Sequence, residues 1–175
     1  MVRILAKAAA VTAAAAGVML VVAACSASGD PKSGTESLTL TTHSVAANPV
    51  YHAVATGVFS ATGTMRATST ASNAPLKLSF PGGTFVMDKV TPGRQSGSVN
   101  PATCAAVYSI TGATYKISNG TGSYKGIKGS GTANVKFGGR LPKLSNGKCD
   151  ESPSAVPVKG TAVAVIHASG PVTLP

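Results

Sequence analysis

The sequence predicts an all-β protein: a single antiparallel β-barrel of about eight strands, preceded by a signal peptide and a flexible tether. Thr, Val and Ser dominate the chain from Leu38 onward, and Gly or Pro interrupts it about every eight to twelve residues, a spacing typical of sandwiches and barrels. No long segment keeps a helical period, whereas several alternate apolar and polar residues. Closure is favoured because a closed sheet leaves no edges exposed.

The first element, residues 1–24, has the layout of a secretory signal peptide. Arg3 and Lys7 precede the uncharged run Ala8–Ala24, which ends in small residues. The run is at the lower limit of membrane-spanning length and is rich in Ala, which inserts weakly into bilayers. A cleaved signal is therefore favoured over a permanent membrane helix.

The residues Val22, Ala23, Ala24 and Cys25 resemble the bacterial lipobox. The resemblance implies a diacylglyceryl group on the sulfur of Cys25, cleavage before Cys25, and acylation of the new N-terminus, for example by palmitate. Each buried methylene contributes ~0.8 kcal/mol, so two or three acyl chains anchor a protein stably. The expected location is the extracytoplasmic face of the cell membrane. The alternative is an ordinary signal peptide with Cys25 as an incidental thiol.

Residues 25–36 form the expected tether. After Cys25 the stretch SASGDPKSGTE carries too few apolar groups to repay the entropy of ordering it. The remaining residues, 37–175, are the usual size of one domain with one core.

The formal net charge is +10, and it falls to +8 when the signal peptide takes Arg3 and Lys7 with it. The positive charge results mainly from the small number of acidic residues, and the sequence contains no run of consecutive Lys or Arg. A solvated surface with scattered lysines is favoured over a surface that binds anionic lipid or acidic wall polymer. No nucleic-acid partner is expected, because the chain lacks a basic helix or a basic-aromatic stacking motif.

Strands are predicted where apolar and polar residues alternate in the segments between turn signals. Two such turn signals are Pro81-Gly82-Gly83 and Asn119-Gly120. The proline-rich segment Leu141–Val158 is expected to be a long loop. Three stretches show one apolar and one polar face, namely Leu38 with Leu40, Leu76–Phe80 and Ala133–Phe137. The other expected strands are Val50–Ala61, Thr62–Thr70, Gly83–Val90, Ala105–Ile110, Thr114–Ser118 and Gly160–Ala168.

Besides Cys25, the mature domain contains two cysteines, Cys104 and Cys149. A pair of thiols in an exported protein predicts a disulfide. In the chain-entropy model it would stabilise the fold by about 4 kcal/mol. A metal or redox pair is the competing interpretation, but the chain has no CxxC motif and no histidine near either cysteine.

The segment TGATYKISNGTGSYKGIKGSGT, Thr111–Thr132, together with Phe80–Val86 and Val54–Thr64, resembles the allene oxide cyclase-like and dirigent-like β-barrels. That group carries a GGTGxYxGxxGxGT pattern. Asn119 replaces its first glycine, and the matching residues are Gly120, Thr121, Gly122, Tyr124, Gly126, Gly129, Gly131 and Thr132. The resemblance implies a barrel with a cavity. The glycines are expected to be architectural, and no residue-by-residue match to a cyclase active site is found.

No catalytic residue, metal site or cofactor is expected. Asp88 is the only acid within the predicted strands, and Asp150 and Glu151 are neighbours in the predicted loop, unlike a catalytic pair held across a substrate. The histidines His43, His52 and His167 have no compact metal-binding spacing. No GxSxG motif is present.

The leading functional hypothesis is a non-enzymatic envelope lipoprotein. Its barrel either fills with its own side chains or holds one apolar or amphipathic small molecule. One alternative is an isomerase or cyclase that acts on a lipid-like substrate, with His52 or a tyrosine near the barrel mouth. Another is a structural surface protein that binds acidic wall polymer. The oligomeric state does not follow from the sequence. The expected core aromatic residues are Phe59, Phe80, Phe85, Tyr115 and Phe137.

Overall fold

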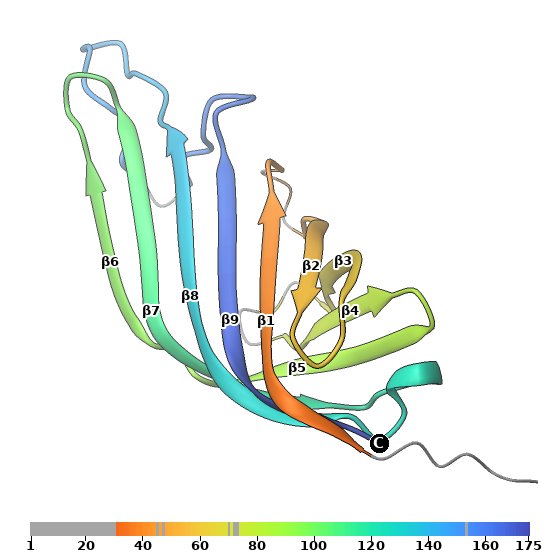
Figure 1. Cartoon of the computed structure of the whole chain (residues 1–175). Coiled ribbons are helices and arrows are strands. Elements are labelled where there is room, and N and C mark those ends of the chain that lie inside the picture. Colours follow the sequence, from red (N-terminus) through yellow and green to blue (C-terminus); the bar gives the residue numbers. More distant parts are fainter. Residues whose placement is uncertain (1–30, 45, 47, 70, 72–73, 153) are drawn as a thin grey trace, which may run out of the picture.

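A computed structural model describes residues 31–175, except residues 45, 47, 70, 72–73 and 153. The described residues form nine strands and one short 3-10 helix, η1 (Gly122–Tyr124), so the all-β prediction is confirmed (Figure 1). The strands are β1 (Lys32–Thr42), β2 (Tyr51–Thr56), β3 (Ala61–Ala67), β4 (Leu76–Phe80), β5 (Gly83–Thr91), β6 (Arg94–Val99), β7 (Ala105–Ser118), β8 (Lys128–Arg140) and β9 (Val163–Leu174).

Eight of these strands close into an antiparallel barrel. Neighbouring strands pair in the order β5-β4-β3-β2-β1-β9-β8-β7, and a further pairing of β5 with β7 completes the ring. The predicted eight-stranded barrel is therefore confirmed. The ninth strand, β6, lies outside the ring and was not predicted from the sequence.

Strand β7 is shared between two neighbours along one edge. Its last residues, Thr114–Ser118, pair with β5, whereas Ala106–Thr111 pair with β6. The sequence predicted two strands here, but a register shift between Ile110 and Ala113 lets one strand continue. Because β6 departs from β5 at this level, the wall of the barrel opens outward, and β6 to β9 and β1 rise as a curved sheet (Figure 1).

The barrel core follows the predicted alternation. Leu38 and Leu40 of β1, Leu78 and Phe80 of β4, and Ile166 of β9 are all buried. These side chains share one cluster with the aromatic residues Phe85, Tyr115 and Tyr124. Phe59 packs against that cluster while half-buried, and Phe137 is half-buried further along β8.

The folded domain begins earlier than predicted. Strand β1 starts at Lys32, so residues 32–36 belong to the sheet and not to the tether. The reason is that β9 extends to Leu174 and needs a partner, which Lys32–Glu36 supply by pairing with Gly170–Leu174. The predicted signal peptide and Cys25 lie outside the described residues. In the part of the chain that the structure describes, no helix is long and apolar enough to cross a bilayer.

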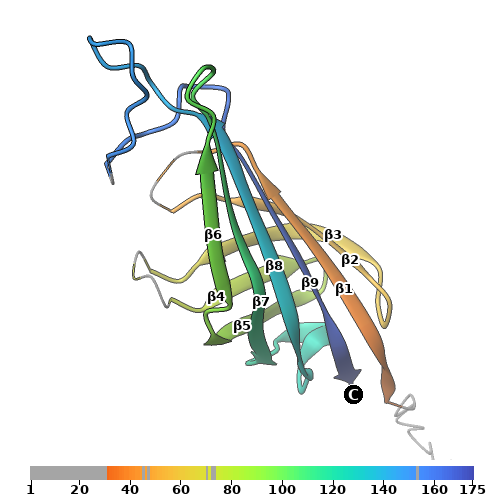
Figure 2. The ribbon, with the colours of Figure 1, turned by 90° about the vertical axis from the view of Figure 1, so that its left-hand side faces the viewer.

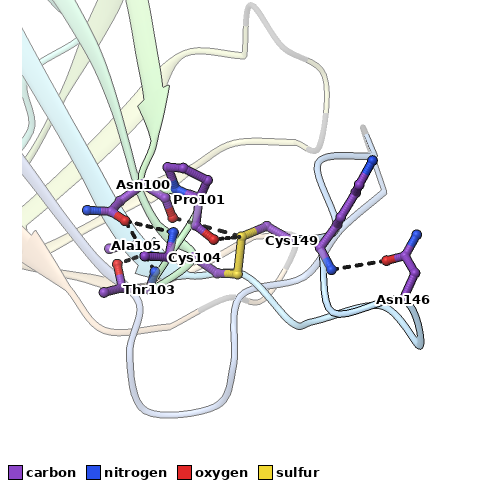
Figure 3. Close-up of a disulfide and its surroundings, with 9 residues drawn as sticks. Asn100, Pro101, Thr103, Cys104, Ala105, Asn146 and Cys149 are labelled. Carbon is purple, nitrogen blue, oxygen red and sulfur yellow. Dashed lines mark hydrogen bonds between the residues drawn. A yellow bond between two sulfur atoms is a disulfide. The ribbon is translucent and has the colours of Figure 1, made fainter.

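The predicted disulfide between Cys104 and Cys149 is present, with Cα atoms 5.4 Å apart (Figure 3). It joins the β6–β7 turn to the long loop between β8 and β9. Asn100 shapes this turn, because its side-chain oxygen accepts hydrogen bonds from the N–H groups of Ala102 and Thr103. The loop projects at one end of the molecule, called here the upper end, and the C-terminus lies at the opposite, lower end (Figure 2).

Candidate functional site

The barrel contains a cavity of about 510 Å³ in its upper half. It lies where β5 and β6 part, so it opens beside the β5–β6 turn. Its walls come from six strands, β4 to β9, and that turn. The lining residues are Leu76, Met87, Lys89, Val90, Thr91, Pro92, Gln95, Ile110, Ala113, Thr114, Tyr115, Ala133, Val135 and Ile166.

Small side chains create this space. Strand pairing places Ala113 of β7, Ala133 of β8 and Ala168 of β9 at the same level of the barrel. Larger residues in these positions would fill the interior, as Ile117 does nearer the lower end. Ala113 and Ala133 line the cavity, so their small side chains leave room that the neighbouring strands do not occupy.

The turn between β5 and β6 determines where the cavity opens. Gly93 in this turn has φ +75°, a conformation that side chains rarely adopt. A Cβ atom at Gly93 would lie 2.6 Å from the carbonyl oxygen of Thr111 and 2.6 Å from the amide nitrogen of Ala113. The turn therefore packs directly against the β7 residues at the register shift. From this turn, β6 runs away from the closed ring of strands.

Tyr115 and Met87 form the floor of the cavity, and both are buried. Tyr115 pairs with Gly131 in β8, and a Cβ atom at Gly131 would lie 2.6 Å from the hydroxyl oxygen of Tyr115. The glycine thus makes room for the tyrosine hydroxyl. Burial raises the pKa of Tyr115, and the charge of Glu36 raises it further.

Glu36 is a buried acid at the lower end of the barrel, with 1% of its surface exposed. Its Oε2 atom accepts a hydrogen bond from the backbone N–H of Phe59 at 3.1 Å, and its Oε1 atom has no hydrogen-bond partner. Desolvation by burial raises the pKa of Glu36, and backbone hydrogen bonds from Phe59, Val58 and Thr56 partly offset this. The buried carboxyl group of Glu36 therefore holds the β2–β3 loop against β1 through this hydrogen bond.

Four aromatic rings pack together at this lower end. The ring of Phe59 lies 5.0 Å from that of Tyr124 and 5.7 Å from that of Phe80, both edge to face, and Phe80 stacks on Phe85 at 5.7 Å. Burial and the charge of Glu36 raise the pKa of Tyr124. The lower end is thus filled by side chains, in contrast to the cavity above it.

The glycine-rich segment behind the family resemblance closes this end. Thr121 accepts a hydrogen bond from the Thr84 N–H at 3.0 Å, and η1 follows it. A Cβ atom at Gly122 would lie 2.0 Å from the carbonyl oxygen of Gly82, so the segment touches the β4–β5 turn backbone to backbone. Tyr124 then enters the aromatic cluster.

The histidines and the remaining acids lie away from the cavity. His52 and His167 are exposed on the outer face, where His167 lies 3.3 Å from the hydroxyl of Thr39. Asp88 is half-buried and accepts a hydrogen bond from Ser118 at 2.9 Å. Among the described residues, no three His, Cys, Asp or Glu side chains are grouped as they would need to be to hold a metal ion.

Sequence reasoning missed Glu36, because it assigned this residue to the tether. A signal was present, since Glu36 stands two residues before Leu38 and four before Leu40, on the same face of an extended strand. Lys89 follows Phe85 and Met87 with the same period and was also missed.

No known protein family, curated protein or solved structure matches this chain. The resemblance to the allene oxide cyclase-like and dirigent-like barrels stays a prediction.

Proposed function

We propose that this protein binds one apolar or amphipathic small molecule in the cavity of its barrel. The observation that carries the proposal is the apolar cavity of about 510 Å³ above the floor formed by Tyr115 and Met87. Small-molecule sites usually have volumes of about 300–1,000 Å³ and mostly apolar walls with a few polar groups. An eight-stranded barrel is just wide enough to hold one such ligand.

The distribution of packing supports this proposal. The lower end is filled by the aromatic cluster, so the fold has a stable base that does not depend on a ligand. The disulfide ties the loops at the upper end. Between these two ends, Ala113 and Ala133 leave space where larger residues would have improved packing.

Native mass spectrometry with solvent extraction tests the proposal. The mature-length chain, residues 25–175 with Cys25→Ser, is exported to an oxidising compartment and purified without detergent. We expect a retained mass of lipid size in the wild-type barrel and its loss in Ala133→Phe, which fills the cavity. Thr132→Phe, the adjacent exposed position on the outer face, is the control. An empty wild-type barrel that also binds no added apolar probe would refute the proposal.

We further propose that Cys25 anchors this barrel to the outer face of the cell membrane. Only residues 26–31 separate Cys25 from β1, and an extended chain of that length reaches roughly 25 Å. The lower end would then face the bilayer, and the cavity would open away from it. Cys25→Ser should release the protein from the membrane fraction or leave it unprocessed. Normal processing and membrane fractionation of this variant would contradict the anchor.

A second candidate is an isomerase or cyclase that acts on the bound molecule. Glu36 and Tyr115 favour it, because a buried carboxyl with an unpaired oxygen interacts with the tyrosine that floors the cavity. An isomerase conserves mass, so the ligands retained by wild type and by Glu36→Gln should share one mass and differ in chromatographic retention. Identical retention in both would leave binding as the sole function.

A further inference from the structure

The polar lining residues of the cavity lie on one side. Lys89 and Thr91 come from β5, Gln95 from β6 and Thr114 from β7, whereas the opposite wall, from β8 and β9, is entirely apolar. The hydroxyl groups of Thr91 and Thr114 are 2.9 Å apart, so they bridge β5 and β7 at this level. Among the described lining residues, Lys89 is the only charged one.

The strand period places Lys89 on the cavity side. In β5, Phe85 and Met87 are buried inward-facing residues, and Lys89 is the next position on the same face. Asp88 lies on the opposite face, where Ser118 donates a hydrogen bond to it. A cation therefore occupies an inward position one step above the apolar floor, and its side chain reaches solvent at the rim.

We infer that the ligand is an anionic amphiphile, with its charged group beside Lys89 and its apolar body against Met87, Ile166 and Val135. This inference rests on the proposed function and names the ligand class for the same site. A cation at the rim of an apolar cavity attracts an anionic group, and that group stays partly hydrated there. Gln95, which also lines the cavity, offers it a hydrogen-bond donor.

Two fluorescent probes with the same phenylnaphthylamine skeleton distinguish the contribution of ligand charge to affinity from the contribution of apolar contacts. One is 8-anilinonaphthalene-1-sulfonate, which is anionic, and the other is N-phenyl-1-naphthylamine, which is neutral. Both are titrated into the mature-length Cys25→Ser chain and into two further variants of it, Lys89→Met and Lys77→Met. Lys77 is exposed in the neighbouring strand β4 and does not line the cavity, so it serves as the control.

We expect Lys89→Met to weaken binding of the sulfonate roughly fivefold, as for a solvent-accessible ion pair, and to leave the neutral probe bound as tightly or more tightly. Lys77→Met should change neither affinity, and added salt should weaken only the sulfonate in the wild type. If both probes bind and Lys89→Met leaves the sulfonate affinity unchanged, the inference is wrong and the proposed function stands. If neither probe binds the folded barrel, the proposed function itself fails.

Discussion

The carboxyl group of Glu36 in β1 accepts a hydrogen bond from the backbone N–H of Phe59, 3.1 Å away in the β2–β3 loop. Two residues far apart in the sequence are thereby joined at the lower end of the barrel. Gly57 permits the approach, because its Cβ atom would lie 2.2 Å from the carbonyl oxygen of Thr35. The same contact buries an acid among aromatic rings, and this couples stability to pH.

Replacing Glu36 by Gln should remove part of the pH dependence of folding. Burial raises the pKa of Glu36 in the folded state, so the folded protein binds the proton more tightly than the unfolded chain does. The stability supplied by the protonated group is therefore complete below the unfolded pKa of about 4.5 and is lost as the pH rises through the higher folded pKa. Urea unfolding between pH 4 and pH 8 should show a smaller decline for Glu36→Gln.

Glu151→Gln is the matched control, because Glu151 is exposed in the upper loop. It should keep the wild-type pH profile. A wild-type profile in Glu36→Gln as well would show that Glu36 does not titrate on folding.

Gly131→Ala should destabilise the barrel by about 1–3 kcal/mol, the usual cost of overpacking. The added Cβ atom would lie 2.2 Å from the carbonyl oxygen of Ser169 and 2.6 Å from the Tyr115 hydroxyl, so backbone must move. Gly138→Ala in the same strand is the control, since its nearest neighbour, Val163 Cγ1, is 3.6 Å away. Equal urea midpoints for the two variants would contradict the close packing described at Gly131.

Replacing both Cys104 and Cys149 by Ser should lower the free energy of unfolding by about 4 kcal/mol, because the disulfide closes a loop across 45 residues of sequence separation. Urea unfolding with and without dithiothreitol measures this. The reductant should destabilise the wild type and leave the double variant unchanged. A wild-type protein that is equally stable with its disulfide fully reduced would show that this bond does not stabilise the fold.

Phe59→Ala should destabilise the fold by about 3 kcal/mol, since it removes the ring that contacts Phe80, Phe85 and Tyr124. Tyr108→Ala is the comparison, because Tyr108 is 39% exposed on β7 and lies outside the core cluster. Its effect on the urea midpoint should be clearly smaller. A larger loss for Tyr108→Ala would mean that stability resides in the upper sheet.

The elements that sequence reasoning placed well are those with local signals. Leu38 with Leu40 and Leu76 with Leu78 and Phe80 alternate with polar residues, and two-residue alternation alone assigns the faces of a strand. Strand β6 was missed because RQSGSV has no apolar face and almost every side chain in it is exposed. The extensions of β8 and β9 were missed because Gly129, Gly131 and Gly170 read as turn residues, although here they accommodate close neighbours.

The amino-acid sequence was enough to predict the class of fold, the alternation that builds the core, and the pairing of the only two cysteines in the described chain. The expectation of export and lipidation at Cys25 also comes from sequence alone. Tertiary structure decided where the barrel closes, because β5 meets β7 only after the intervening strand has left the ring. It also decided the burial of Glu36 and the position of Lys89 at the cavity rim, since both depend on residues from distant strands, and no local pattern specifies which strands meet.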